Sequence, residues 1–69
     1  MEHYLFLLGP YDSTVVGPFA SRLGAVWQRK ALKKTWKYDI HIWNQIEYDA
    51  NVAEFGPIEV VAPKEYSDG

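Results

Sequence analysis

The sequence of 69 residues contains no cysteine, which excludes a disulfide framework and a zinc site built from thiolates. It has only two histidines, His3 and His41, and their spacing matches no zinc-binding helix motif. We therefore expect neither a metal site nor a cofactor.

Long hydrophobic runs are also missing. The longest apolar run at the N-terminal end, residues 4 to 8, is too short for a signal-peptide core or a membrane span. We expect a cytoplasmic protein without a membrane partner.

The chain lacks the residue patterns of an active site. The two Gly-Pro pairs offer no run of free N–H groups for a phosphate, because proline has none. Asp39 and His41 share a strand parity, but the nearest nucleophiles, Ser13 and Ser21, are explained by a turn and a helix cap. We expect no catalytic residues and no enzyme activity.

The composition is typical of a small folded domain rich in aromatic side chains. Hydrophobic residues make up 48% of the chain and aromatic residues 16%, which suits a small core filled by large rings. We expect one domain over residues 1–63 and a flexible polar tail over residues 64–69.

Two similar sequence motifs, LGPYDS and VGPFAS, occur in the first third of the chain. The first follows an apolar strand at residues 3 to 8 and predicts a hairpin loop over residues 9 to 13. In the second, Gly17-Pro18 ends a short strand at residues 14 to 16, and Ser21 caps a helix.

The remaining elements follow from hydrophobic periodicity. Residues 22 to 36 contain no proline, and their apolar residues recur at helical spacing, which predicts an amphipathic helix. The expected inward stripe of this helix consists of Leu23, Val26, Trp27 and Ala31. Alternation predicts a strand over residues 37 to 48. Residues 49 to 57 form either one helical turn, closed by Gly56-Pro57, or a loop, and residues 58 to 62 form a last strand.

These elements predict an α+β fold, with a single amphipathic helix packed on one face of a small, mainly antiparallel sheet of three to four strands. Residues 3 to 8 pair with residues 38 to 43 or 58 to 62. The expected core is Leu5, Leu7, Leu23, Val26, Trp27, Ile40, Ile42 and Val60. Replacing Trp27 by alanine should then cost about 3 to 5 kcal/mol.

Basic residues are concentrated in one segment. Residues 22 to 37 hold six of the seven basic residues and no acid, so the segment carries +6; the remainder, with one lysine and nine acids, carries −8. Such a segment favours a negatively charged partner. The candidate contact residues are Arg29, Lys30, Lys33, Lys34, Lys37 and Trp36.

A second candidate surface lies on the strand predicted after the helix. If the helix covers Tyr38, Ile40 and Ile42, then His41 and Trp43 face outward and offer an aromatic contact surface. The two parities differ little in apolarity, so the pattern leaves open which face is exposed.

The stretch YLFLL followed by VGPFASRLGAVWQRKALKKTWKYDIHIW, within residues 4–43, resembles one half of a SPOR (sporulation-related repeat) domain. SPOR domains bind the glycan strands of peptidoglycan, so this resemblance implies a glycan-binding function. In style the chain also resembles small phage-encoded orphan proteins, which implies action on a host protein in the host cytoplasm.

Three functions follow. The first is a non-enzymatic, phage-type binding protein that contacts a host protein or a second copy of itself. The second is a nucleic-acid binder that uses the basic helix at residues 22–37, with phosphates on the lysines and bases on the tryptophans. The third is a SPOR-like glycan binder.

Overall fold

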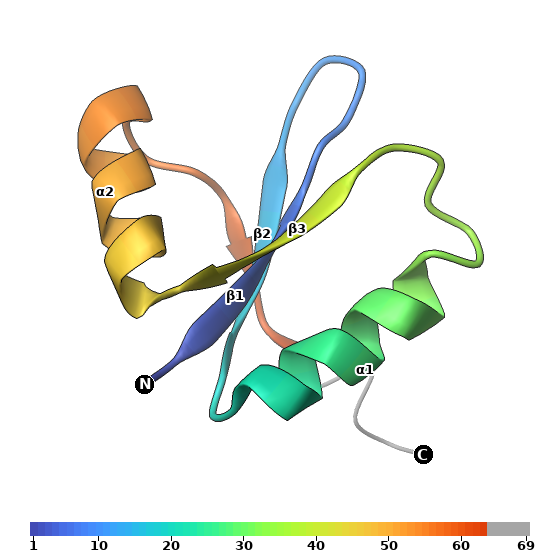
Figure 1. Cartoon of the computed structure of the whole chain (residues 1–69). Helices are drawn as coiled ribbons and strands as arrows, with labels where there is room; N and C mark the ends of the chain where they lie inside the picture. The colour runs from blue at the N-terminus through green and yellow to red at the C-terminus, as the bar shows by residue number, and fades with distance from the viewer. Residues whose placement is uncertain (64–69) are drawn as a thin grey trace.

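Four strands and two helices make up the chain in a computed structural model that describes residues 1–63 (Figure 1). In chain order the elements are β1 (His3–Leu7), β2 (Thr14–Phe19), α1 (Arg22–Leu32), β3 (Ile40–Asn44), α2 (Gln45–Phe55) and β4 (Val60–Val61). The α+β class is confirmed, but the expectation of a single helix is wrong. The polar tail predicted over residues 64–69 lies outside the described residues.

The strands form one mixed sheet in the order β3-β1-β2-β4. Strand β1 lies in the middle and pairs antiparallel with β2 and β3, whereas β4 pairs parallel with β2. The predicted pairing of residues 3 to 8 with residues 38 to 43 is confirmed. Residues 58 to 62 contribute only the short β4, which lies at the edge beyond β2.

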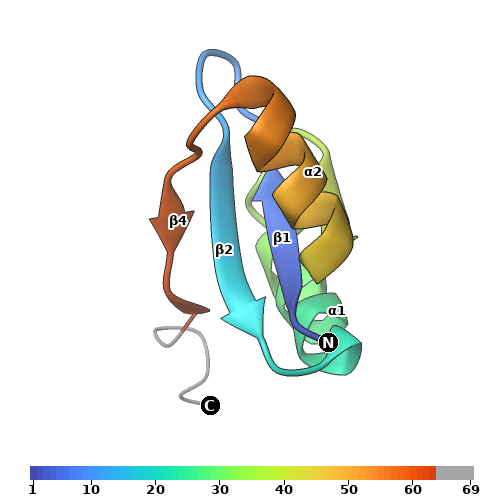
Figure 2. The same ribbon diagram turned by 90° about the vertical axis from the view of Figure 1, so that its left-hand side faces the viewer.

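The two helices lie on opposite faces of the sheet. Figure 2 shows α2 in front of the strands and α1 behind them. The expectation that only one face is covered is therefore wrong, since α2 packs against β1 and β3 from the other side.

The core lies between α1 and the sheet. Leu5 and Leu7 on β1 face the same side as Ile42 and Ile40, their register partners on β3. The core cluster consists of Leu5, Leu7, Val16, Phe19, Ala25 and Ile40, with Leu32, Trp36, Ile42 and Val61 packed against it. Leu5, Leu7 and Ile40 were predicted correctly, Val26 is half-buried, and the assignment of Val60 to the core is wrong because its side chain is exposed.

Helix α1 starts as predicted but presents a different face to the sheet. The Ser21 hydroxyl accepts a hydrogen bond from the Gly24 N–H, 3.3 Å away, and caps the first turn. The buried residues of α1 are Ala25 and Gln28. Leu23 and Trp27 are exposed, so the predicted inward stripe is wrong.

Strand β2 continues through Gly17-Pro18 instead of ending there. A side chain at Gly17 would place its Cβ 2.7 Å from the Tyr4 ring, so only glycine lets this ring lie against β2. Strand β2 thereby reaches Phe19, which is buried in the core.

The segment predicted as one strand over residues 37 to 48 is a strand followed by a helix. The Asn44 side chain accepts a hydrogen bond from the Glu47 N–H, and the Glu47 carboxylate accepts one from the Asn44 N–H. This reciprocal capping box starts α2 and ends β3. Helix α2 ends at Gly56, whose φ of 92° is readily adopted by glycine.

Candidate functional site

The side of α1 that points away from the sheet combines apolar and basic side chains. With 3.6 residues per turn, the residues opposite the buried Ala25 and Gln28 are Leu23, Trp27 and Lys30, and Lys34 follows in the turn after the helix. Leu23 is 65% exposed and Trp27 is 61% exposed. We call Leu23, Trp27, Lys30, Ala31 and Lys34 the α1 outer face.

The α1 outer face contains a shallow hollow beside the Trp27 ring. Trp27, Lys30, Ala31 and Lys34 line it, and its volume is about 300 Å³. The Lys30 ammonium lies 5.3 Å from the centre of the Trp27 ring, which is within range of a cation–π contact. The hollow therefore has an apolar floor with positive charge at its margin.

The other predicted basic residues extend this charge along the segment. Lys33 and Lys37 are exposed, and Arg29 is half-buried. Lys33 forms the C-cap of α1. These residues extend the positive charge beyond the α1 outer face, where a negatively charged partner would meet it.

Trp36 has a structural role that the sequence did not indicate. Its indole N–H donates a hydrogen bond to the Leu8 carbonyl, 2.9 Å away, and its ring packs against the core cluster. It also makes an edge-to-face contact with Tyr38. Because these contacts hold the ring in place, Trp27 is the tryptophan of the basic segment that offers most of its surface to a partner.

His41 and Trp43 lie on the other side of the sheet, away from α1. The Trp43 ring stacks on Phe6 with ring centres 4.3 Å apart, and the His41 ring centre lies 6.4 Å from that of Phe6. His41 is exposed and Trp43 is half-buried. Of the eight predicted contact residues, Trp36 packs against the core, and the other seven are divided between the α1 segment and the opposite side of the sheet.

Four residues of these surfaces were not among the predicted contacts. Leu23 and Trp27 were assigned to the core, Ala31 was assigned to the inward stripe of the helix, and Phe6 was read only as part of an apolar strand. The four-residue spacing of Leu23 and Trp27 was visible in the sequence, but it fits an inward or an outward face equally well. That Phe6 lies on the same surface as His41 follows only from the strand register, in which the two residues are partners.

Tyr4 links α2 to the sheet. Its ring stacks on Tyr48 at a centroid distance of 4.1 Å, and its hydroxyl donates a hydrogen bond to the Gln45 side-chain oxygen, 3.0 Å away. Burial and the nearby Glu2 carboxylate raise the pKa of the Tyr4 hydroxyl above its usual value. These contacts fasten α2 to the sheet and leave Tyr4 in its neutral, protonated form.

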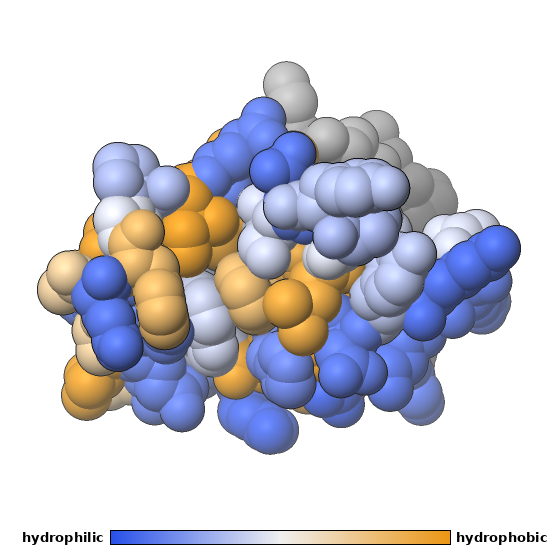
Figure 3. All heavy atoms as spheres, turned by 90° about the horizontal axis from the view of Figure 1, so that it is seen from above, coloured by the Kyte–Doolittle hydropathy of each residue, from blue (hydrophilic) through white to orange (hydrophobic). Residues whose placement is uncertain are grey.

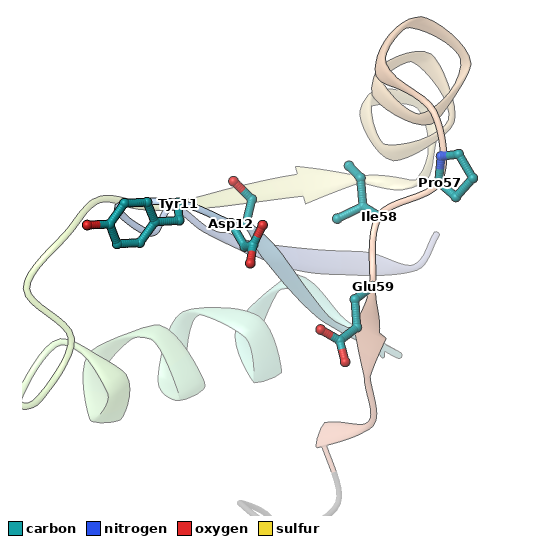
Figure 4. Close-up of a pocket in the computed structure, with 6 residues that line it drawn as sticks. Tyr11, Asp12, Pro57, Ile58 and Glu59 are labelled. Carbon is teal, nitrogen blue, oxygen red and sulfur yellow. The ribbon is translucent and has the colours of Figure 1, made fainter.

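A second hollow lies between the β1–β2 loop and the segment that leads into β4 (Figure 4). Its volume is about 400 Å³, and its lining residues are Tyr11, Asp12, Ser13, Pro57, Ile58 and Glu59. Figure 4 shows the Asp12 and Glu59 carboxylates on opposite sides of this space. Two carboxylates without a basic residue disfavour an anionic ligand.

The end of the molecule that carries the β1–β2 loop is not uniformly polar. Figure 3 looks down on this end and shows orange, hydrophobic side chains at the surface between blue, hydrophilic ones.

Across residues 1–63, no three side chains of the types His, Asp and Glu gather closely enough to hold a metal ion. Within the same range, neither helix has the length and apolarity needed to cross a membrane.

Comparisons with known proteins add no relative: no family model, no curated protein and no solved structure matches the chain. The resemblances to a SPOR half and to small phage proteins therefore stay predictions. Functional inference rests on the surfaces described above.

Proposed function

We propose that this chain is a small binding protein without catalytic activity, and that its α1 outer face docks on a protein partner with an acidic surface. The observation that carries the proposal is the exposure of Trp27 in a hollow that Lys30 and Lys34 also line. Exposing a large indole to water is unfavourable unless a partner covers it, and tryptophan is enriched among residues that dominate binding energy.

The composition of this face fits a protein partner. Leu23 and Trp27 supply an apolar centre one helical turn apart, and Lys30 and Lys34 supply charge beside it. A partner needs an apolar group for the hollow and carboxylates around it. The resemblance to phage-encoded proteins suggests a host protein as this partner.

Capture from host-type lysates with the immobilised chain tests the proposal. An interactor that binds the wild type should be lost on Trp27→Ala and on the double variant Lys30→Glu/Lys34→Glu. Tyr11→Ala removes from the β1–β2 loop an aromatic ring that is even more accessible than that of Trp27, so it is the matched control and should retain the interactor. If every interactor survived Trp27→Ala and the charge reversal, the α1 outer face would not be the docking site.

Nucleic acid is the second candidate, because basic residues beside an exposed indole also suit single-stranded DNA. Its support is weaker, since Trp36 is engaged with the core and Trp27 remains as the stacking ring of the segment. A single-stranded oligonucleotide titrated at low and moderate salt separates the two candidates. Binding that falls steeply with salt and needs Trp27 would favour nucleic acid over protein.

A further inference from the structure

Strand β3 is an edge strand of the sheet. It pairs with β1 on one side, and no strand of residues 1–63 pairs with its other side. At five residues it is longer than β4, the strand at the opposite edge. An unpaired edge of this length is a template for another strand.

The alternation of an antiparallel ladder shows which backbone groups of β3 are free. The Leu8 N–H donates to the Asp39 carbonyl at 3.0 Å, so the backbone groups of residues 39, 41 and 43 face β1. Those of Ile40 and Ile42 therefore point outward. The next outward N–H, that of Asn44, is already bonded to the Glu47 carboxylate at 2.9 Å.

We propose that two copies of this chain pair antiparallel through their β3 edges, with Ile40 opposite Ile42 of the partner subunit. In this register the N–H and C=O of both isoleucines find partners on the other copy. The two-fold axis passes between His41 and the partner's His41, which face each other as a non-hydrogen-bonded pair. The two sheets then join into one continuous sheet.

The residues that flank β3 identify a second copy as the occupant. Exposed apolar side chains lie just outside both ends of the strand, Tyr38 at 48% exposed and Ile46 at 65% exposed. Lys37 comes directly before Tyr38, and Glu47 directly after Ile46. Antiparallel pairing brings the Lys37 end of one copy beside the Glu47 end of the other, so positive meets negative at both ends.

This inference is independent of the proposed function. None of the residues that form the β3 edge belongs to the α1 outer face, which lies on the far side of α1 from the sheet. A dimer can therefore form whether or not Trp27 binds an acidic protein.

The molar mass in solution, measured by light scattering on a sizing column, tests the dimer. The wild type should show twice the mass of one chain. His41→Lys places two like charges directly opposite each other at the axis and should give one chain mass. His41→Thr is the matched control; it places an uncharged, strand-favouring residue at this exposed position and should remain dimeric.

Cross-linking tests the register. Because the chain has no cysteine, His41→Cys introduces a single thiol. Facing residues of a non-hydrogen-bonded pair are close enough for a disulfide, so mild oxidation should link two copies. Tyr11→Cys, far from the edge in the β1–β2 loop, should remain unlinked under the same conditions.

Three results would overturn the proposal. The first is a wild type with the mass of one chain. The second is a His41→Lys variant that stays dimeric while circular dichroism shows it folded, because the contact would then lie elsewhere. The third is a His41→Cys variant that cross-links no faster than Tyr11→Cys.

Discussion

Trp27 and Trp36 lie in the same basic segment but differ in what they contact. Trp36 packs on the core cluster and bonds the Leu8 carbonyl, whereas Trp27 is mostly exposed and contacts Lys30. The value of about 3 to 5 kcal/mol that the sequence predicts for Trp27→Ala requires a ring packed in the core. Trp36, which is half-buried and packs on the core cluster, comes closer to this condition than Trp27 does.

We expect Trp36→Ala to lower the free energy of unfolding by about 3 kcal/mol, because it removes core contacts and leaves the Leu8 carbonyl without its indole donor. Trp27→Ala should lower it by less than about 1 kcal/mol, the range of surface substitutions. Urea denaturation of the two variants beside the wild type measures both values. Equal losses would contradict the orientation of α1.

At the scale of elements, α1 shows why hydrophobic periodicity can give the wrong face. Leu23 and Trp27 are larger and more apolar than Ala25 and Gln28, so a count of apolar residues points them inward. The structure buries the small Ala25 instead, which lets α1 lie close to the sheet, and Phe19 and Trp36 supply bulk from outside the helix. The periodicity of one segment does not show which side chains other elements contribute to the core.

The boundary between β3 and α2 shows a different limit. Ile46 and Tyr48 continue the alternation of Ile40 and Ile42, so the strand pattern extends four residues too far. The signal that ends it is the capping sequence Asn-Gln-Ile-Glu at residues 44 to 47, which alternation does not register. A local hydrogen-bond pattern here overrides the hydrophobic period.

The cap also predicts a measurable loss. Asn44→Ala removes the acceptor of the Glu47 N–H and should cost about 1 kcal/mol of stability, with α2 affected most because none of its residues is buried. Circular dichroism during thermal unfolding checks the loss. Asn44→Asp keeps an acceptor at this position and is the control, which should melt close to the wild type. An Asn44→Ala variant as stable as Asn44→Asp would show that the cap contributes nothing.

At the scale of the whole molecule, the sequence identified the α+β class and the Ser21 cap, and it gave the pairing of β1 with β3 as one of two alternatives. It also located the basic segment by composition alone. It missed the start of the second helix because hydrophobic alternation does not register the local cap at Asn44, and it missed the parallel pairing of β4 with β2 because that pairing joins segments far apart in the chain. Since their positions also depend on distant segments, the candidate contact residues could be named individually but not assigned to separate surfaces.

The arrangement of these elements predicts an uneven distribution of stability. Strand β1 is bonded on both sides and carries Leu5 and Leu7 into the core, whereas α2 has no buried residue and is fastened through Tyr4. Backbone amides of β1 should therefore exchange with deuterium most slowly, and those of α2 should exchange faster through local opening. Native-state hydrogen exchange followed by NMR measures this order.

Tyr48→Ala removes the ring that stacks on Tyr4, so this variant should speed exchange in α2 and leave β1 nearly unchanged. If amides of α2 exchanged as slowly as those of β1, the two layers would unfold as one cooperative unit.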